Sequence, residues 1–177
     1  PDWLLVSWNG DAGCPVAVEG QQPAARGRAG AGEALTLAHV RDRAEAELGF
    51  PLVVKLNTGG SSVGVEIVHA AADFEGAFAR VASSSTERTT GILLERYIPG
   101  RELTAAILLG RRLPLLEIRP RDGFYDFRHK YTDGASEYLV PAPVHSPVYE
   151  NICADALRLH DLLGCQGLAR VDWRLDD

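Results

Sequence analysis

The 177-residue sequence contains no methionine, few cysteines and no long apolar run. It begins at Pro1, so the missing initiator methionine predicts a fragment or a processed piece. Cys14, Cys153 and Cys165 are odd in number and lack paired metal-site spacing, which is typical of free thiols in a reducing compartment. No stretch approaches the roughly 20 apolar residues of a membrane-spanning helix, and no signal-peptide pattern is visible. We therefore expect a cytoplasmic protein without a membrane partner.

Positive charge is also scarce. The formal net charge is -6 and the sequence pI is about 5.4. No basic stripe is left over to bind a phosphate backbone, which argues against a dedicated nucleic-acid partner. Hydrophobic residues make up 46% and charged residues 24%, as in folded soluble proteins. The length allows one ordinary domain or two small ones.

Lysine is especially rare. Lys and Arg total 18, yet Lys55 and Lys130 are the only lysines. Where arginine serves as the usual surface cation, a retained lysine is a candidate for a task that needs a compact point charge on a thin stem. For either lysine considered alone, chance is the favoured explanation, and only the surroundings of both lysines change that.

Apolar residues at a helical period predict several helices. One is expected over residues 34–48. Another starts near residue 74, and its expected apolar face is Phe74, Ala77, Phe78 and Val81. A third begins with Ser146 as N-cap and Pro147 at the first helical position, and ends at Gly164. Its expected face is Tyr149, Ile152, Cys153, Ala156, Leu157 and Leu163.

Short apolar runs bounded by turn residues predict strands. They lie at residues 14–19, 50–56, 63–69, 92–98, 102–109, 113–119 and 167–175. A glycine loop joins 50–56 to 63–69 as a hairpin. Tight turns at Pro99-Gly100 and Gly110-Arg111 separate the three strands that follow. In the last strand Arg170 and Asp172 have the same parity and so face the same side.

A glycine-rich loop, Gly59-Gly60-Ser61-Ser62-Val63-Gly64, follows Lys55. Its amides and hydroxyls could form a concavity for phosphate oxygens, and the lysine could neutralise their charge. The P-loop and the dinucleotide fingerprint do not apply, because both need a helix after the glycines. A mobile surface turn is the alternative interpretation.

Three further segments carry groups suited to a nucleotide. Residues 95–102 (ERYIPGRE) place a carboxylate at each end of a strand and turn, suited to an adenine amino group and to ribose hydroxyls. Residues 124–131 (FYDFRHKY) place Lys130 in an aromatic loop that could act as a lid. Asp172 is suited to Mg²⁺, with Arg170 beside it for phosphoryl charge. Solvated charges, a structural loop and a local ion pair are the respective alternatives.

Together and in this order, these motifs resemble the ATP-grasp ligases, and among them the D-alanine:D-alanine ligases. The resemblance rests on residues 54–55, 60–64, 95–102, 124–131 and 170–172, with 12–16 similar to the entry into the central domain. It implies an α+β ATP-grasp fold with two small subdomains, residues 1–94 and 95–177, each with an antiparallel sheet and helices. ATP would bind between them.

The resemblance also implies roles for individual residues. Lys55 would contact phosphate, Glu95 the adenine and Glu102 the ribose. The other expected ATP-binding residues are Gly60, Ser61, Ser62, Val63, Arg96, Tyr97, Ile98, Phe124 and Lys130. The expected catalytic residues are Arg170, Ser61, Tyr131 and Lys130. Asp172 would bind Mg²⁺ or Mn²⁺.

The implied reaction joins two D-alanines through an acyl phosphate, and the product is the dipeptide of bacterial cell-wall precursors. The sequence departs from the family pattern in several places. The family's amino-terminal substrate domain is absent, and so is a lysine ahead of the central domain. Leu56 stands where a proline is usual, and the segment with the remaining metal ligands would follow Asp177. We therefore expect the full-length protein, often a dimer in this family, to be the enzyme.

Two alternatives remain open at this point. Another ATP-grasp ligase would join different amino acids or a hydroxy acid. A nucleotide-binding or interaction domain would have lost activity. Substrate-dependent phosphate release distinguishes the first from the leading interpretation, and the sequence after Asp177 bears on the second.

Overall fold

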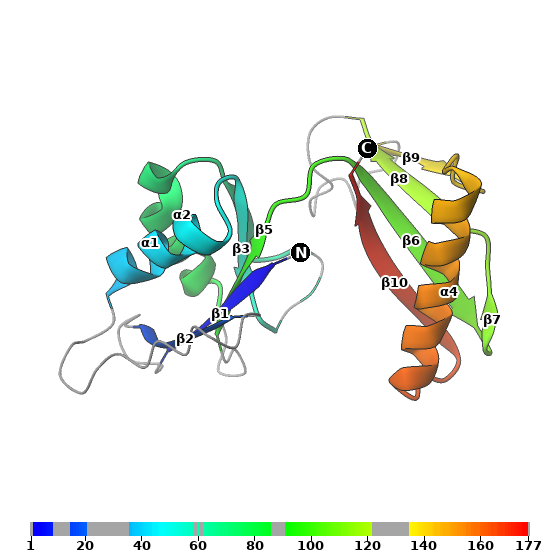
Figure 1. The fold of residues 1–177 in the computed structure, drawn as a ribbon, viewed down its shortest axis with the longest axis horizontal. Coiled ribbons are helices and arrows are strands. Elements are labelled where there is room, and N and C mark those ends of the chain that lie inside the picture. Colours follow the sequence, from blue (N-terminus) through cyan, green and yellow to red (C-terminus); the bar gives the residue numbers. More distant parts are fainter. Residues whose placement is uncertain are drawn as a thin grey trace. The chain divides into compact units, whose positions relative to one another are not determined.

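The computed structural model describes residues 2–8, 15–20, 36–58, 60, 62–85, 91–121 and 135–176, without the side chains of residues 8 and 15–20. The chain divides into two compact units, Pro1–Tyr97 and Ile98–Asp177. Each unit has a sheet and a hydrophobic core of its own (Figure 1). We describe each unit by itself.

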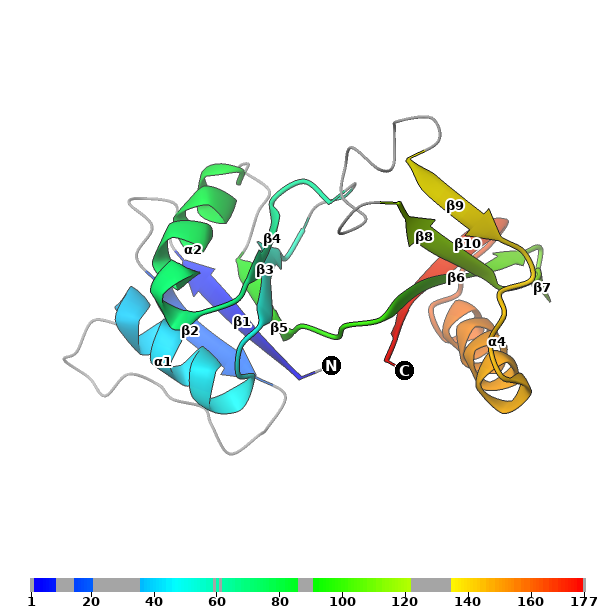
Figure 2. The ribbon, with the colours of Figure 1, turned by 90° about the horizontal axis from the view of Figure 1, so that it is seen from above.

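The first unit contains an antiparallel five-stranded sheet in the order β2-β1-β5-β3-β4. Its strands are β1 Trp3–Trp8, β2 Pro15–Gly20, β3 Leu52–Leu56, β4 Val65–Val68 and β5 Ile92–Arg96. Helices α1 (Leu37–Glu47) and α2 (Phe74–Ser83) lie on the same side of this sheet (Figure 2), and a 3₁₀ turn, η1 (Ala71–Asp73), precedes α2.

Alternation along the strands divides the first sheet into two faces. The face toward the helices is apolar and forms the core with Val40 and Ala44 of α1 and the predicted face of α2. Its buried strand residues are Leu4, Val6, Leu52, Val54, Val68, Ile92 and Leu94. The residues between them, including Lys55 and Glu95, therefore lie on the opposite face.

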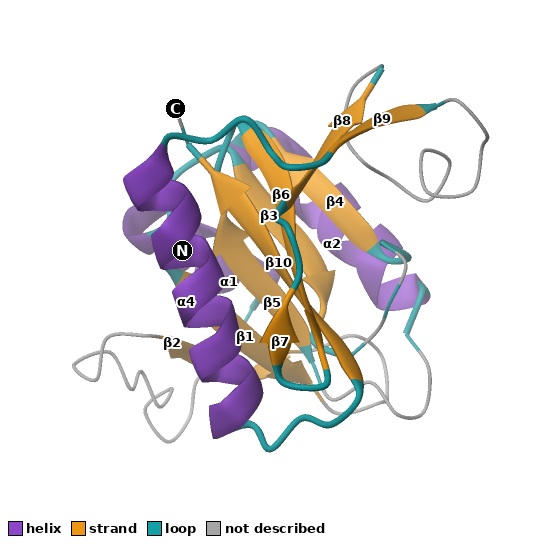
Figure 3. Cartoon of the chain, turned by 90° about the vertical axis from the view of Figure 1, so that its right-hand side faces the viewer, coloured by secondary structure: helices purple, strands orange, loops and turns teal. Residues whose placement is uncertain are grey.

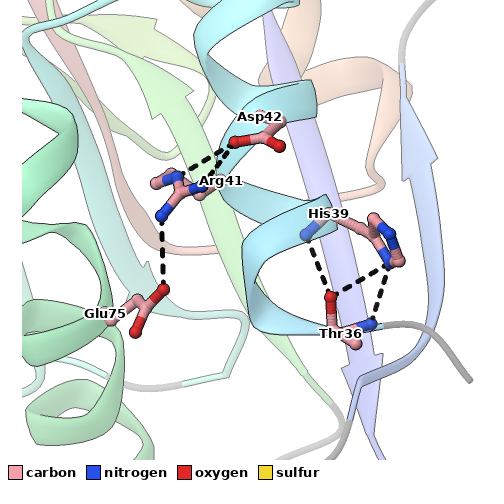
Figure 4. Close-up of polar contacts among 5 residues, drawn as sticks. All are labelled: Thr36, His39, Arg41, Asp42 and Glu75. Carbon is pink, nitrogen blue, oxygen red and sulfur yellow. Dashed lines mark hydrogen bonds and ion pairs between the residues drawn. The ribbon is translucent and has the colours of Figure 1, made fainter.

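Helix α1 begins at Leu37 because Thr36 caps it. The Thr36 side chain accepts from the His39 amide at 3.3 Å, and His39 Nδ1 accepts from the Thr36 amide at 3.3 Å (Figure 4). This is a capping box in which histidine replaces the usual Glu or Gln. Arg41 then connects the helices, since its guanidinium contacts Asp42 on α1 at 2.8 Å and Glu75 on α2 at 3.3 Å. The predicted start at residue 34 lies outside the described residues.

The second unit contains a five-stranded antiparallel sheet in the order β10-β6-β8-β9, with β7 paired to β6. Its strands are β6 Arg101–Leu108, β7 Arg111–Arg112, β8 Leu116–Pro120, β9 Ser136–Leu139 and β10 Leu168–Leu175. Helix α4 (Ser146–Leu162) runs along one face, over β6 and β10 (Figure 3). Its buried residues Ile152, Cys153 and Ala156 pack against Leu103, Ala105 and Ile107.

The structure corrects three details of the predicted fold. Pro99-Gly100 does not close a hairpin, because β5 and β6 belong to different sheets. The N-cap of α4 is His145, so Ser146 is already helical. Leu163 is not on the buried face, since it follows the last turn of α4 and is 73% exposed. Strands β1, β7 and β9 were not predicted, and the strand expected at 113–119 is β8, which begins at Leu116.

The remaining elements agree with the sequence. The glycine-loop hairpin is β3–β4, and the residues expected on the apolar face of α2 are all buried. Cys153 and Cys165 are free thiols, as expected, and burial raises the pKa of the Cys153 thiol. Cys14 lies outside the described residues. Within the described part of the chain, no helix is both long and apolar enough to cross a membrane.

Candidate functional site

Lys55 and Glu95 meet on the face of the first sheet that α1 and α2 leave uncovered. Val53 is opposite Glu95 and Lys55 is opposite Leu93, so the two charged residues are diagonal neighbours on β3 and β5. Their Nζ and Oε2 atoms lie 2.8 Å apart, and their side chains are 32% and 24% exposed. The sequence had predicted both as nucleotide contacts but not this ion pair.

A pocket of about 310 Å³ adjoins Lys55. Its lining combines the lysine with polar groups of the glycine turn and an apolar wall: Lys55, Leu56, Asn57, Gly60, Ser62, Val63, Val65 and Leu93. A single cation next to an apolar wall suits an anionic ligand that also has an apolar part. Gly60, Ser62 and Val63, which were predicted to bind ATP, therefore lie around one pocket with Lys55.

The described residues of the turn beside this pocket make two backbone hydrogen bonds. The Val63 amide donates to Gly60 O at 3.1 Å, and the Leu56 amide donates to Gly64 O at 3.2 Å. Ser62 and Gly64 have φ angles of 58° and 65°, in the left-handed region. A Cβ on Gly64 would also lie 3.0 Å from Leu56 Cγ, so glycine suits this position on two grounds.

Arg96, predicted to lie in the adenine-binding segment, contacts other parts of the first unit. Its Nη2 lies 3.1 Å from Asp2 Oδ2 and donates to Glu47 O at 3.3 Å. The Tyr97 amide donates to Pro51 O at 3.3 Å. These contacts fix the end of β5 against β1 and the end of α1. The Arg96 amide also donates to Asp2 O at 3.0 Å, so the side chain and the backbone N–H of Arg96 both make contacts within the first unit.

Glu102, the predicted ribose contact, lies at the start of β6 directly opposite Arg174 of β10. Arg174 Nη1 is 3.6 Å from Glu102 Oε2. The same guanidinium donates to Ile98 O through Nε at 3.2 Å and through Nη2 at 3.1 Å. The structure thus groups Glu102 with Ile98, another predicted ATP contact. Sequence reasoning gave Arg174 no role, although its alternation with Arg170 and Asp172 was a usable signal.

Asp172 and Arg170 face the same side of β10, as predicted. Arg170 Nη2 lies 3.1 Å from Asp172 Oδ2, and Thr104 Oγ1 donates to Asp172 Oδ1 at 2.8 Å. Both charged side chains are more than half exposed, at 59% and 54%. An exposed, oriented carboxylate fits one position in the coordination shell of Mg²⁺. No cluster of three or more His, Cys, Asp or Glu residues suited to a metal occurs in the ranges that the structure describes.

A charged cluster that the sequence did not reveal lies at Glu117, which is 1% exposed. Arg101 donates to Glu117 through Nε at 3.0 Å, Arg119 donates through Nε at 2.7 Å, and Arg101 also donates to Pro143 O at 3.1 Å. The hydrogen bonds from Arg101, assisted by Arg119, lower the pKa of Glu117 from 4.5 to about 2. The cluster joins β6 and β8 to the segment before α4.

Several predicted site residues lie outside the described residues. They are Ser61, Phe124, Lys130 and Tyr131, together with Gly59 of the glycine loop. The expected binding of ATP by Lys130 together with Lys55 therefore stays a prediction.

Comparison with known proteins shows the family to which the chain is similar. The family model described as D-ala D-ala ligase C-terminus matches residues 31–177. The D-alanine--D-alanine ligase of Desulforudis audaxviator is 47% identical over 130 residues, which cover 72% of this chain and 42% of that protein. The chain thus spans less than half the length of this relative.

Solved structures of ligases also resemble the chain, among them two from Bacillus anthracis and Enterococcus faecalis. One is D-alanine--D-alanine ligase from Bacillus anthracis complexed with ATP, with a TM-score of 0.57, 32% identity, and coverage of 82% of this chain and 43% of that one. The other is VanG D-Ala:D-Ser ligase from Enterococcus faecalis, with a TM-score of 0.61, 29% identity, and coverage of 78% and 40%. With the two antiparallel sheets, these matches confirm the predicted α+β fold of the ATP-grasp ligases. The chain therefore belongs to the D-alanine–D-alanine ligase family, whose C-terminal part it matches over residues 31–177.

Proposed function

We propose that this chain is the ATP-binding part of a ligase that joins two D-alanines at the expense of ATP. The observation that carries the proposal is the 47% identity to a D-alanine--D-alanine ligase. The Lys55 pocket and the Asp172–Arg170 pair support it, because they supply a cation and a carboxylate of the kinds that a magnesium nucleotide needs. We assign the two ATP-grasp subdomains, predicted as residues 1–94 and 95–177, to the compact units Pro1–Tyr97 and Ile98–Asp177.

The nucleotide contacts follow from this assignment. Lys55 binds a phosphate, and residues 60–63, Ser61 included, close over the phosphates. Glu95 and the segment 96–98 bind the adenine, and Glu102 accepts from the ribose hydroxyls. Phe124 borders the base. Because Lys55 is paired with Glu95 at 2.8 Å, the incoming phosphate shares the ammonium with that carboxylate.

The chemistry has two steps. The carboxylate of one D-alanine attacks the γ-phosphate of ATP to form an acyl phosphate and ADP. The amine of the second D-alanine then attacks the acyl carbon, and phosphate leaves. Lys55, Lys130 and Arg170 stabilise the negative charge that builds on the transferring oxygens. Ser61 and Tyr131 order the lid near the substrates.

Mg²⁺ or Mn²⁺ would be held by Asp172 with the ATP phosphates, and it would neutralise phosphate charge there. Thr104 and Arg170 orient the Asp172 carboxylate for this task, at 2.8 Å and 3.1 Å. The product would enter cytoplasmic peptidoglycan synthesis, and the full-length protein would act as a homodimer on small-molecule substrates alone.

The test is phosphate release by the complete gene product with ATP and Mg²⁺. D-alanine is expected to stimulate release, and the dipeptide should appear in the same reaction by mass spectrometry. L-alanine is the matched control. If D-alanine has no effect while ATP still binds, the chain is a nucleotide-binding domain without this activity.

A second candidate is a ligase that joins D-alanine to another acceptor. It is favoured by the likeness to VanG, which is named as a D-Ala:D-Ser ligase and has a TM-score of 0.61 to this chain. Supplying D-alanine with D-serine or D-lactate in the same assay distinguishes the two. A mixed product in excess of the D-alanine dipeptide would favour this second candidate.

A further inference from the structure

One guanidinium in the second unit contacts two groups that the proposed function assigns to the nucleotide. Arg174 donates to Ile98 O through Nε and Nη2, at 3.2 and 3.1 Å. Its Nη1 lies 3.6 Å from Glu102 Oε2. The Arg174 and Glu102 side chains are only 29% and 19% exposed, so solvent screens their interaction less than that of a surface pair.

The geometry explains why this residue is an arginine. A guanidinium is a rigid planar fork, so Nε and Nη2 can hold a carbonyl on one edge while Nη1 points elsewhere. A lysine ammonium is a single point on a flexible stem and does not fix two acceptors in this way. The separation of 3.6 Å between Arg174 Nη1 and Glu102 Oε2 is that of an ion pair rather than a close hydrogen bond.

The backbone supplies a second, independent anchor for the same segment. Gly100 has a φ of 106°, and a Cβ there would lie 2.2 Å from Leu175 O, so the chain passes directly against the end of β10. Leu175 in turn is paired with Arg101 in the ladder. The segment from Ile98 to Glu102 is therefore held on β10 by a side chain at one point and by close backbone packing at another.

We infer that Arg174 is a positioning residue for nucleotide recognition, which couples the place of the Glu102 carboxylate to that of the Ile98 backbone. It acts through these two groups and does not touch the nucleotide. The inference rests on the proposed function, because it takes Glu102 as the ribose contact. Its specific consequence is that the preference for a ribose with hydroxyls depends on Arg174.

The test compares the binding of Mg·ATP and of Mg·2′,3′-dideoxy-ATP to the complete gene product by calorimetry. Wild type is expected to prefer ATP by about 10- to 100-fold, since a hydrogen bond to a charged group is lost with the hydroxyls. In Arg174→Gln the preference should fall to about 3-fold or less, as in Glu102→Gln. Arg112→Gln removes an exposed cation paired with Glu150 at 2.6 Å, and it should keep the wild-type preference.

Arg174→Lys is the second variant, in case Arg174→Gln does not fold. It keeps the charge but not the planar fork. The preference for Mg·ATP over Mg·2′,3′-dideoxy-ATP should therefore be lower than in wild type by about 3-fold or more. A folded Arg174 variant, as judged by circular dichroism, with the wild-type preference would overturn the inference and leave the proposed function intact. Wild-type protein that binds neither nucleotide would overturn both.

Discussion

Lys55 and Glu95 form an ion pair across β3 and β5, with 2.8 Å between Nζ and Oε2. Lys55 also lines the pocket beside the glycine turn. Glu95 holds the Lys55 ammonium in place before a ligand binds. The entropic cost of ordering the lysine side chain on binding is therefore lower than for a freely rotating lysine. The same contact means that a ligand phosphate competes with a carboxylate already present.

Removing the Lys55 charge is expected to weaken ATP binding. Lys55→Gln should raise the Kd for Mg·ATP by about 10- to 100-fold, because a charge-assisted hydrogen bond to phosphate is lost. Calorimetry on the complete gene product measures this. Arg80→Gln is the control, since it removes an exposed cation paired with Glu66 at 2.6 Å in the same unit. Equal affinity in Lys55→Gln and wild type would contradict the phosphate role.

Asp172→Asn is expected to raise the Mg²⁺ concentration for half-maximal phosphate release by about 10- to 100-fold. The amide keeps the shape of the side chain but loses the charge that a hard cation prefers. A magnesium titration at saturating ATP and D-alanine gives the value. Asp155→Asn, at an exposed position on α4, should leave the titration unchanged. An unaltered curve for Asp172→Asn would remove this residue from the metal site.

The Glu117 cluster predicts a pH-dependent contribution to stability. The folded-state pKa is lowered from 4.5 to about 2, so the stabilisation is present above 4.5 and is lost as pH falls toward 2. Glu117→Gln should lower the free energy of unfolding by about 3 kcal/mol at pH 7. Its difference from wild type should shrink between pH 4.5 and 2.

Urea unfolding at several pH values measures this difference. Glu150→Gln is the control, because Glu150 and its partner Arg112 are 55% and 51% exposed. An exposed pair contributes about 1 kcal/mol or less. A Glu117→Gln effect as small as that of Glu150→Gln would show that the buried cluster does not stabilise the fold.

Gly100→Ala is expected to destabilise the second unit by roughly 3 kcal/mol. The new Cβ would lie 2.2 Å from Leu175 O, and the φ of 106° disfavours any side chain. Gly110→Ala is a matched control with a φ of 74° and nothing within 4 Å of its Cβ, so only backbone strain of about 1 kcal/mol applies. Denaturant unfolding compares the two variants. Equal losses in the free energy of unfolding would mean that the backbone around Leu175 moves to accommodate the new Cβ without cost.

Much of the fold was predictable because the core residues follow regular periods. The buried face of α2 and the alternation of β10 are visible in the sequence, and the structure has them. The correction at Pro99-Gly100 has a clear cause. A Pro-Gly pair marks a change of chain direction, but which strand pairs with which depends on long-range packing that a local motif does not encode.

The sequence predicted contacts in the site only where residues of suitable chemistry are also neighbours along a regular strand. Arg170 and Asp172 share parity, so their proximity followed from the strand period. Arg174 and Glu117 were missed because their importance comes from partners that are distant in sequence, such as Ile98 for Arg174 and Arg101 for Glu117. The strand period places Arg174 on the same side as Arg170 and Asp172, but it does not identify a partner that is distant in sequence.

Strand β10 carries charge on one side and core on the other, with Arg170, Asp172 and Arg174 alternating with Val171, Trp173 and Leu175. A one-residue deletion or insertion within it would exchange the two sets, exposing the aromatic and aliphatic side chains while burying two guanidiniums and a carboxylate. Homologous genes should therefore accept substitutions along this strand far more readily than any change in its length.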